Sequence, residues 1–293
     1  MFLSKNWKNF ENLKKDRTYL IKVYEKLLKI LSKKLNHEFK LNKPLIYWRI
    51  ILGPWLIFYL VSNYNRWLIT KNRKKQILKK LQNFRIKDNL IFVNYDINDF
   101  YQKSKEDDDY FNSSLLRIIN PNKLYNIGKS KKFNLNFKKK NSKKKLINYF
   151  DLILSYISLF FSKYLIDIQY FPKTILFKLF FYSKIFPALH RLNLKDFDRE
   201  RINFNQIKKN NFFKIEKNKN FDKFEKFIFK NFTLDYPIQY FEFFEKNRKR
   251  IMFLSSFPKK VIITMTSHMF NEKFKFYLAE MISKKSKLII IEH

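Results

Sequence analysis

The sequence predicts an α/β protein that is rich in helices and has a parallel strand-helix-strand unit near its C-terminal end. Residues 260–265 and 286–292 are short apolar runs typical of buried strands, and residues 271–284 between them have helical character. A strand, a helix and a second strand within about thirty residues form a right-handed parallel unit. Ligands of open α/β sheets bind beyond the carboxyl ends of the strands, so function is expected at that edge.

The N-terminal part of the chain is predicted to be helical. Within residues 17–35, apolar residues recur every three or four positions, which indicates an amphipathic helix with lysines on its outer face. Lys43-Pro44 ends the pattern, because proline disfavours helix in the residue before it. Further helices are predicted at residues 64–84, 221–232 and 240–250.

Residues 45–61 are the most apolar stretch of the chain. The run contains Arg49 and Pro54 and is at the short end of what crosses a bilayer. A buried core segment or an interfacial segment is therefore expected in place of a membrane span. Gly53-Pro54 is expected to fix a turn or a kink, and Trp48 and Trp55 are expected in the core.

Two other apolar regions complete the fold prediction. Residues 89–95 suit a buried strand. Residues 149–190 are rich in Phe, Leu and Ile, and Phe171-Pro172 and Phe186-Pro187 divide them into short pieces predicted as helical. These pieces could form a core layer or a face that rests on a membrane.

The composition weakens the net charge as evidence for function. The chain has a formal net charge of +37, a balance typical of proteins that bind nucleic acid or anionic membranes. It also has 35 Phe and only 2 Gly, with many Lys, Asn, Ile and Tyr, the residues of AT-rich codons. An AT-rich base composition of the DNA can therefore raise the net charge of the protein without selection for an anionic partner. Cysteine is absent, which fits a reducing cytoplasm and excludes a thiolate site.

Two charged segments are candidate binding sites. Residues 129–146 are lysine-rich and contain no acid, which predicts a solvated loop or, as the alternative, an anion-binding segment. Residues 106–109 are the only acidic cluster and could suggest a metal site. They precede a helix-like run, where a helix dipole favours acids, so no metal is predicted.

Two stretches together resemble a known family. The first is Tyr47-Trp48-Arg49-Ile50-Ile51-Leu52-Gly53-Pro54-Trp55-Leu56, followed by Tyr64-Asn65-Arg66-Trp67. The second runs from Phe257-Pro258-Lys259-Lys260 through Thr266-Ser267-His268, Phe274-Lys275-Phe276 and Ala279-Glu280 to Lys287-Leu288-Ile289-Ile290. Both are similar to transferases of O-antigen and other surface-polysaccharide gene clusters.

The resemblance implies a fold and a domain layout. Members of this family look like GT-B glycosyltransferases, with two Rossmann-like domains. Residues 1–293 would then be the helix-rich, acceptor-side N-terminal domain, incomplete at its C-terminus, and the donor domain would be absent or separately encoded. In the family, a Gln-His-Gly-Gly-like turn follows the last strand. Here Glu292 stands in place of the Gln and His293 matches the His. The chain alone is therefore expected to show no detectable transfer.

The resemblance and the strand ends together suggest the site residues. His268 and His293 are the candidate catalytic residues, and Arg49, Ser267 and Asn271 are the candidate substrate-binding residues. His268 could act as a base toward an acceptor hydroxyl or bind a donor phosphate, or it could be a plain surface histidine. Arg49 could clamp a phosphate or carboxylate, or bond backbone carbonyls in the core. Asn271 could also cap the helix that follows it.

The function expected from the sequence is transfer of a sugar from a nucleotide-activated donor to a glycan or lipid-linked acceptor. The nucleotide sugar is a co-substrate, and no resident cofactor is expected. The first residues lack the apolar core of a secretory signal, so a cytoplasmic place is predicted, peripheral to the inner membrane face. The alternatives are a basic RNA-binding protein, such as an organellar ribosomal component, and a peripheral membrane protein.

Overall fold

The structure is a computed structural model that describes residues 5–80, 94–106, 108–119, 162–167, 178, 187–189, 209, 211–214 and 220–291. The sequence suggests one domain over residues 1–293, whereas the chain divides into two compact units. Unit 1 is made of Met1–Leu41, Leu52–Asn134 and Arg201–Phe243. Unit 2 is made of Asn42–Ile51, Leu135–Glu200 and Phe244–His293.

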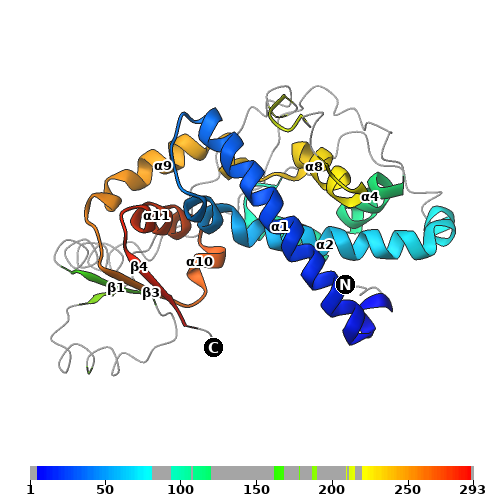
Figure 1. The fold of residues 1–293 in the computed structure, drawn as a ribbon, viewed down its shortest axis with the longest axis horizontal. Helices are drawn as coiled ribbons and strands as arrows, with labels where there is room; N and C mark the ends of the chain where they lie inside the picture. The colour runs from blue at the N-terminus through cyan, green and yellow to red at the C-terminus, as the bar shows by residue number, and fades with distance from the viewer. Residues whose placement is uncertain are drawn as a thin grey trace, which may run out of the picture. The chain divides into compact units, whose positions relative to one another are not determined.

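The described part of unit 1 is helical (Figure 1). Its elements are η1 (Lys5–Lys8), α1 (Phe10–Glu38), most of α2 (Leu45–Lys80), α3 (Ile97–Glu106), α4 (Asp108–Ile119), α8 (Lys223–Asp235) and η3 (Ile238–Tyr240). Residues 89–93 of the predicted strand at 89–95 lie outside the described residues, as does the lysine-rich segment 129–146.

Helix α1 follows from the amphipathic pattern in the sequence. The side chain of Asn9 caps its start by accepting a hydrogen bond from the backbone N–H of Asn12 at 3.2 Å. One face of the helix is buried, with Leu20, Val23, Leu27, Leu28, Leu31 and Leu35 at most 4% exposed. The helix ends before Pro44, as the sequence predicts.

Helix α8 lies in the same unit as α1 and is joined to it by polar contacts. Asp222 and Glu225 form a capping box at its start, each accepting a backbone hydrogen bond at 2.8 Å. Tyr19 of α1 donates a hydrogen bond to Asp222 at 2.7 Å. Lys26 of α1 forms an ion pair with Glu225 at 2.7 Å. The caps of α8 therefore also fix α1 against it.

Helix α2 runs through Gly53-Pro54, so no turn separates two pieces there, and a kink at this site stays a prediction. Pro54 lies inside the helix, although a proline there removes a backbone hydrogen bond and costs about 3 kcal/mol. Burial offsets this cost, because Leu52 and Trp55 on either side of Gly53-Pro54 are 0% exposed. Residues Leu45–Lys71 are long and apolar enough to cross a membrane, yet 61% of the most apolar window is buried within the protein.

Aromatic rings fill the core of unit 1 around Trp55. Its ring stacks on Tyr59 with centroids 5.1 Å apart and meets Tyr236 edge-on, also at 5.1 Å. Phe232 of α8 lies 5.8 Å from the same indole. Trp55 is thus a core residue, as expected, and α2 and α8 are held together by ring packing.

Unit 2 contains a small parallel sheet with helices (Figure 1). Its strands are β1 (Tyr164–Asp167), β2 (Pro187–Leu189), β3 (Val261–Thr264) and β4 (Lys287–Ile290), in the order β2-β1-β3-β4 with all pairs parallel. Its helices are α9 (Phe244–Met252), η4 (Leu254–Ser256), α10 (Ser267–Phe270) and α11 (Glu272–Ser283). The segment β3–α11–β4 occupies the positions where the sequence indicates a strand, a helix and a strand.

Two strands lie where helical pieces were predicted. Residues 164–167 and 187–189 fall inside the apolar region 149–190, and both are strands of the sheet. The helical prediction for these residues is wrong, because short buried apolar runs carry no periodicity that separates a strand from a helix. The four residues of β1 alternate between partly exposed and buried, a pattern that arises from their pairing with β3.

Candidate functional site

The candidate site lies in unit 2, at the edge of the sheet where the parallel strands end. Strand β1 ends at Asp167 and its neighbour β3 ends at Thr264, and the two residues are partners in the register. The chain continues from β3 directly into the short helix α10. Side chains from β1, β3 and α10 are therefore brought to one edge, the place where parallel sheets bind ligands.

Asp167 and Thr264 are linked at this edge. The hydroxyl of Thr264 donates a hydrogen bond to Oδ2 of Asp167 at 2.8 Å. Asp167 is 1% exposed and Thr264 is 0% exposed. A buried carboxylate is costly unless it is hydrogen-bonded, so this bond fixes the orientation of Asp167.

Ser267 and His268 form the first turn of α10, just past the end of β3. Ser267 is buried and its carbonyl accepts the backbone N–H of Asn271 at 3.0 Å. His268 is half-buried. Its Nδ1 is buried, and a hydrogen bond with the backbone of Met265 acts on the ring. The structure thus places His268 beyond a strand end, where the sequence places it.

The environment of His268 favours the neutral imidazole. Burial lowers the pKa of His268, and the nearby charge of Lys275 lowers it further. The backbone of Met265 and the charge of Asp167 act in the opposite direction, but the net shift is downward. At neutral pH the ring is therefore uncharged and able to accept a proton.

A buried ion pair lies in the first turn of α11, next to α10. Lys275 Nζ is 2.8 Å from Glu272 Oε1, and both residues are 0% exposed. Glu272 suits this position because the N-terminus of a helix favours negative charge. The pair holds a fixed positive charge near His268 without exposing it to water.

The structure describes two of the three remaining predicted site residues. Asn271 caps α11, since its side chain accepts the backbone N–H of Phe274 at 2.9 Å. Arg49 lies in the first turns of α2, in unit 2, and is half-buried. His293 lies outside the described residues. The structure therefore brings together Ser267, His268 and Asn271, which follow one another along α10 and α11.

Sequence reasoning missed Asp167 at this edge. Asp167 follows an apolar run, which is the pattern of an acid at the end of a strand. Because the sequence predicts helix for this run, it does not predict an acid at a strand end. Lys275 was part of the resembling motif, yet nothing in the sequence shows that it is fully buried.

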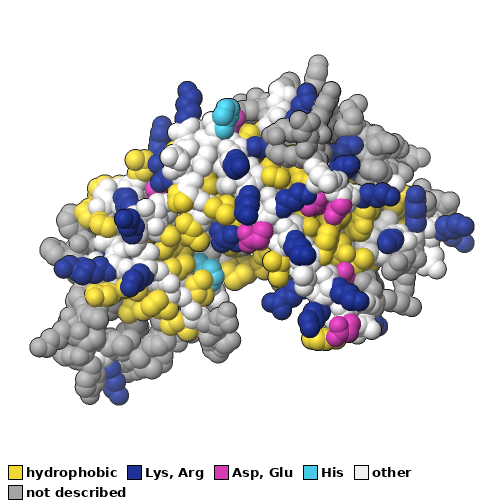
Figure 2. Space-filling view, in the orientation of Figure 1, with side chains coloured by type: hydrophobic (Ala, Val, Ile, Leu, Met, Phe, Trp, Pro, Cys, Tyr) yellow, Lys and Arg dark blue, Asp and Glu magenta, His cyan; other side chains and the backbone are white. Residues whose placement is uncertain are grey.

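No metal centre is evident among the residues that the structure describes. None of their His, Asp and Glu side chains gather in groups of three or more. The side chains of the acidic residues 106–109 lie outside the described ones. On the face drawn in Figure 2, Lys and Arg side chains are scattered among apolar and uncharged atoms.

Comparison with known proteins gives the class of the protein. No curated protein and no solved structure matches the chain. A family model of transferases does match it, over residues 1–293. The matching description is "LIC12162 family transferase", and the chain belongs to this family.

Proposed function

We propose that this transferase moves a sugar from a nucleotide-activated donor to a glycan or lipid-linked acceptor in surface-polysaccharide (O-antigen type) biosynthesis. The fold would be the helix-rich, Rossmann-like N-terminal domain of a GT-B enzyme, at the cytoplasmic face of the membrane. One observation carries the proposal: His268 is half-buried just beyond the carboxyl end of β3, and burial lowers its pKa. The parallel sheet β2-β1-β3-β4 supports it.

The chemistry of this transfer needs a base at the acceptor hydroxyl. The hydroxyl oxygen forms a bond to the anomeric carbon of the donor sugar, and the bond from that carbon to the phosphate oxygen breaks. The hydroxyl proton passes to His268, and the nucleotide leaves with the bonding electrons. A base is most efficient when its pKa lies near the working pH, and the lowered pKa of His268 keeps its imidazole unprotonated and able to accept the proton.

The polar neighbours of His268 would orient the acceptor. Asp167 is held by Thr264, so its charge has a fixed position beside the imidazole and stabilises the imidazolium that forms during transfer. Ser267 supplies a hydroxyl from the residue before the base. Arg49, in the same unit, is the candidate that would bind a phosphate or carboxylate of the substrate.

The test begins with binding. The chain is titrated with UDP-, GDP-, CMP- and dTDP-activated sugars and with lipid-linked and free glycan acceptors, and heat of binding is measured. Transfer is then followed as release of nucleotide in the presence of donor and acceptor. The variants are His268→Asn and, as matched control, His37→Asn, an exposed histidine of α1 in unit 1.

Because no detectable transfer is expected of the chain alone, binding is the deciding measurement, and we expect at least one nucleotide sugar or acceptor to bind. Where acceptor-dependent nucleotide release is measured, His268→Asn should reduce it by about 100-fold, the scale of a lost general base, and His37→Asn should leave it unchanged. If neither nucleotide sugars nor acceptors bind, or if the unaltered chain transfers and His268→Asn transfers equally well, the proposal is wrong. Transfer of a group other than a sugar would keep the transferase family and remove the glycosyl assignment.

A further inference from the structure

Large apolar side chains of α1 are exposed along the first half of the helix, in unit 1. Phe10 is 73% exposed, Leu13 is 40% exposed and Ile21 is 46% exposed. Leu13 and Ile21 follow Phe10 by three and eleven positions, and a helix has 3.6 residues per turn. The three side chains therefore lie within about a quarter of a turn of one another and form one stripe.

The same line along α1 is buried farther down the helix. Leu28 lies two turns beyond Ile21 on this line and is 0% exposed. Unit 1 thus covers the line at Leu28 and leaves it open at Ile21. Single exposed apolar side chains are ordinary, but a row of them marks a surface that binds something.

The charge around the stripe is positive. The exposed cations of residues 7–22 are Lys8, Lys14, Lys15, Arg17 and Lys22. The acids of the same residues are Glu11 and Asp16, and Asp16 accepts hydrogen bonds from Trp7 at 2.9 Å and from Tyr64 at 3.0 Å. Five cations against two acids leave an excess of positive charge at the outer face of α1.

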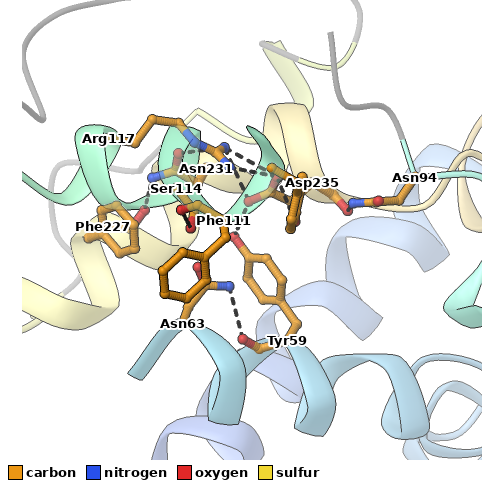
Figure 3. A network of polar contacts seen from close by, with 10 residues as sticks. Tyr59, Asn63, Asn94, Phe111, Ser114, Arg117, Phe227, Asn231 and Asp235 are labelled. Atoms are coloured by element: carbon orange, nitrogen blue, oxygen red, sulfur yellow. Dashed lines mark hydrogen bonds and ion pairs between the residues drawn. The ribbon is translucent and has the colours of Figure 1, made fainter. Parts of the chain in front are cut away.

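A cation in the interior of unit 1 is matched in a different way. Figure 3 shows Arg117 of α4 reaching toward Asp235 at the end of α8, with Tyr59 of α2 pointing to the same carboxylate. Arg117 lies 3.2 Å from Oδ1 of Asp235, and Tyr59 donates to Oδ2 at 2.9 Å. The interior charge is thus balanced by the chain itself, whereas the excess charge of residues 7–22 faces outward.

We propose that the stripe of α1, with Lys14 and Arg17 on the same face, is the surface by which the chain docks on an anionic lipid bilayer. A helix that carries apolar and basic side chains on its outer face binds at the boundary between headgroups and acyl chains. Lys and Arg keep their charge at the lipid phosphates while their stems lie against apolar groups. The proposal rests on the membrane location in the proposed function, and it requires neither the sugar nor His268.

The side chains of the stripe favour a lipid over a nucleic acid. Proteins bind single strands with cations and with aromatic rings that stack on bases. Leu13 and Ile21 are aliphatic and cannot stack in this way. A bilayer accepts all three apolar side chains and pairs the surrounding cations with its phosphates.

The experiment uses single cysteines, because the chain has none of its own. Phe10→Cys and Ile21→Cys carry an environment-sensitive fluorophore, and Phe253→Cys is the matched control, since Phe253 is 65% exposed and lies in unit 2. The whole chain is mixed with vesicles of phosphatidylcholine alone, or of equal parts of phosphatidylcholine and phosphatidylglycerol, in about 0.15 M salt. Co-sedimentation measures binding, and the emission wavelength of the label measures insertion.

The expected result is binding to the mixed vesicles that is about tenfold or more tighter than binding to phosphatidylcholine alone. The labels at positions 10 and 21 should shift to shorter wavelength, and the label at position 253 should not. Phe10→Ser with Ile21→Ser should weaken binding by about tenfold or more, and Phe253→Ser should leave it unchanged. These side chains are exposed, so the variants should keep the fold, which circular dichroism checks.

A second pair of variants separates the site from the total charge. Lys14→Gln with Arg17→Gln should weaken binding by about tenfold, because two cations are lost at the lipid surface. Lys249→Gln with Lys260→Gln removes the same charge from exposed positions of unit 2 and should have a much smaller effect. Equal losses in the two pairs would mean that the net charge of the chain governs binding, and the proposal would be wrong.

Three further outcomes would overturn the proposal. They are no binding to the mixed vesicles, equal wavelength shifts at positions 10, 21 and 253, and a larger shift of the α1 labels with RNA than with vesicles. The sugar-transfer proposal has a separate readout. Labels that shift in a chain that binds no nucleotide sugar or acceptor keep the docking surface alone, and binding of these ligands by a chain whose labels do not shift keeps the sugar assignment alone.

Discussion

Tyr47, near the start of α2, donates a hydrogen bond of 3.0 Å to Glu280 of α11, and the bond is buried. The same carboxylate accepts Lys43 at 2.7 Å and Arg248 of α9 at 2.9 Å. Beside it, the ring of Trp48 packs on Phe244 of α9 at 5.1 Å. The two segments that carry the family resemblance therefore meet within unit 2, and Glu280 is the residue at which they are joined.

Replacing Glu280 should destabilise unit 2 strongly. Glu280→Ala leaves Lys43 and Arg248 without their acceptor, and we expect a loss of about 2–3 kcal/mol, below the value for a fully buried pair because both cations are partly exposed. Tyr47→Phe, the control, removes one neutral donor and should cost about 1 kcal/mol. Urea unfolding followed by circular dichroism measures both. Equal losses would contradict the central place of the carboxylate.

The same carboxylate should make stability depend on pH. Burial alone would raise the pKa of Glu280, but the hydrogen bonds and charges of Lys43 and Arg248 outweigh it and lower the pKa. A lowered folded pKa gives stability that is complete above the unfolded value, about 4.3, and is lost as pH falls through the folded pKa. The free energy of unfolding, measured from pH 7 to pH 3, should therefore fall more steeply in the unaltered chain than in Glu280→Gln.

Asp235 should be the most sensitive acid of unit 1. Asp235→Ala leaves Arg117 buried without a carboxylate and removes the attraction felt by Arg66, so we expect a loss of about 3–5 kcal/mol. The double variant Arg117→Met with Asp235→Leu removes the pair together and should recover a large part of that loss. Urea unfolding again gives the values. A double variant as unstable as the single one would show that the ion pair is not what stabilises this core.

The sequence predicts the parts of this fold whose pattern is local. The segment β3–α11–β4 is readable because two apolar runs flank an amphipathic one and Asn271 provides the cap. Strand β1 is not readable, since its four residues lie in a long apolar region and gain a strand identity only by pairing with β3. Of the turn or kink expected at Gly53-Pro54, the turn is absent, because burial of the flanking residues outweighs the lost backbone bond.

The residues of the candidate site also differ in whether the sequence predicts them. His268 could be placed from the sequence because it follows a recognisable strand directly. Asp167 could not, because its strand was not recognised. The partners of Asp235 come from α2, α4 and α8, and no spacing within any one of these helices indicates that they meet. Long-range polar contacts are thus the part of this protein that a single sequence does not predict.

The titration of His268 tests its environment directly. Because burial lowers the pKa of His268, we expect its imidazole signal in proton NMR to titrate below the ordinary value of about 6.5. His268→Asn identifies the signal among the chain's 4 histidines. The lowered pKa also makes stability depend on pH. The stabilisation that His268 contributes is complete above its unfolded pKa and is lost as the pH falls through its folded pKa. A pKa above 6.5 would contradict a neutral base at this edge.

Neighbouring charges should move that pKa in opposite directions. Lys275 lowers the pKa of His268 and Asp167 raises it, so removing the first should raise the pKa and removing the second should lower it. Lys275 should not be removed alone, because breaking its buried ion pair with Glu272 would cost about 3–5 kcal/mol. The double variant Lys275→Met with Glu272→Leu therefore tests the first, and Asp167→Asn, which keeps an acceptor for Thr264, tests the second. Shifts of the same sign in both variants would contradict the roles given to Lys275 and Asp167, and no shift in either would mean that desolvation alone sets the pKa of His268.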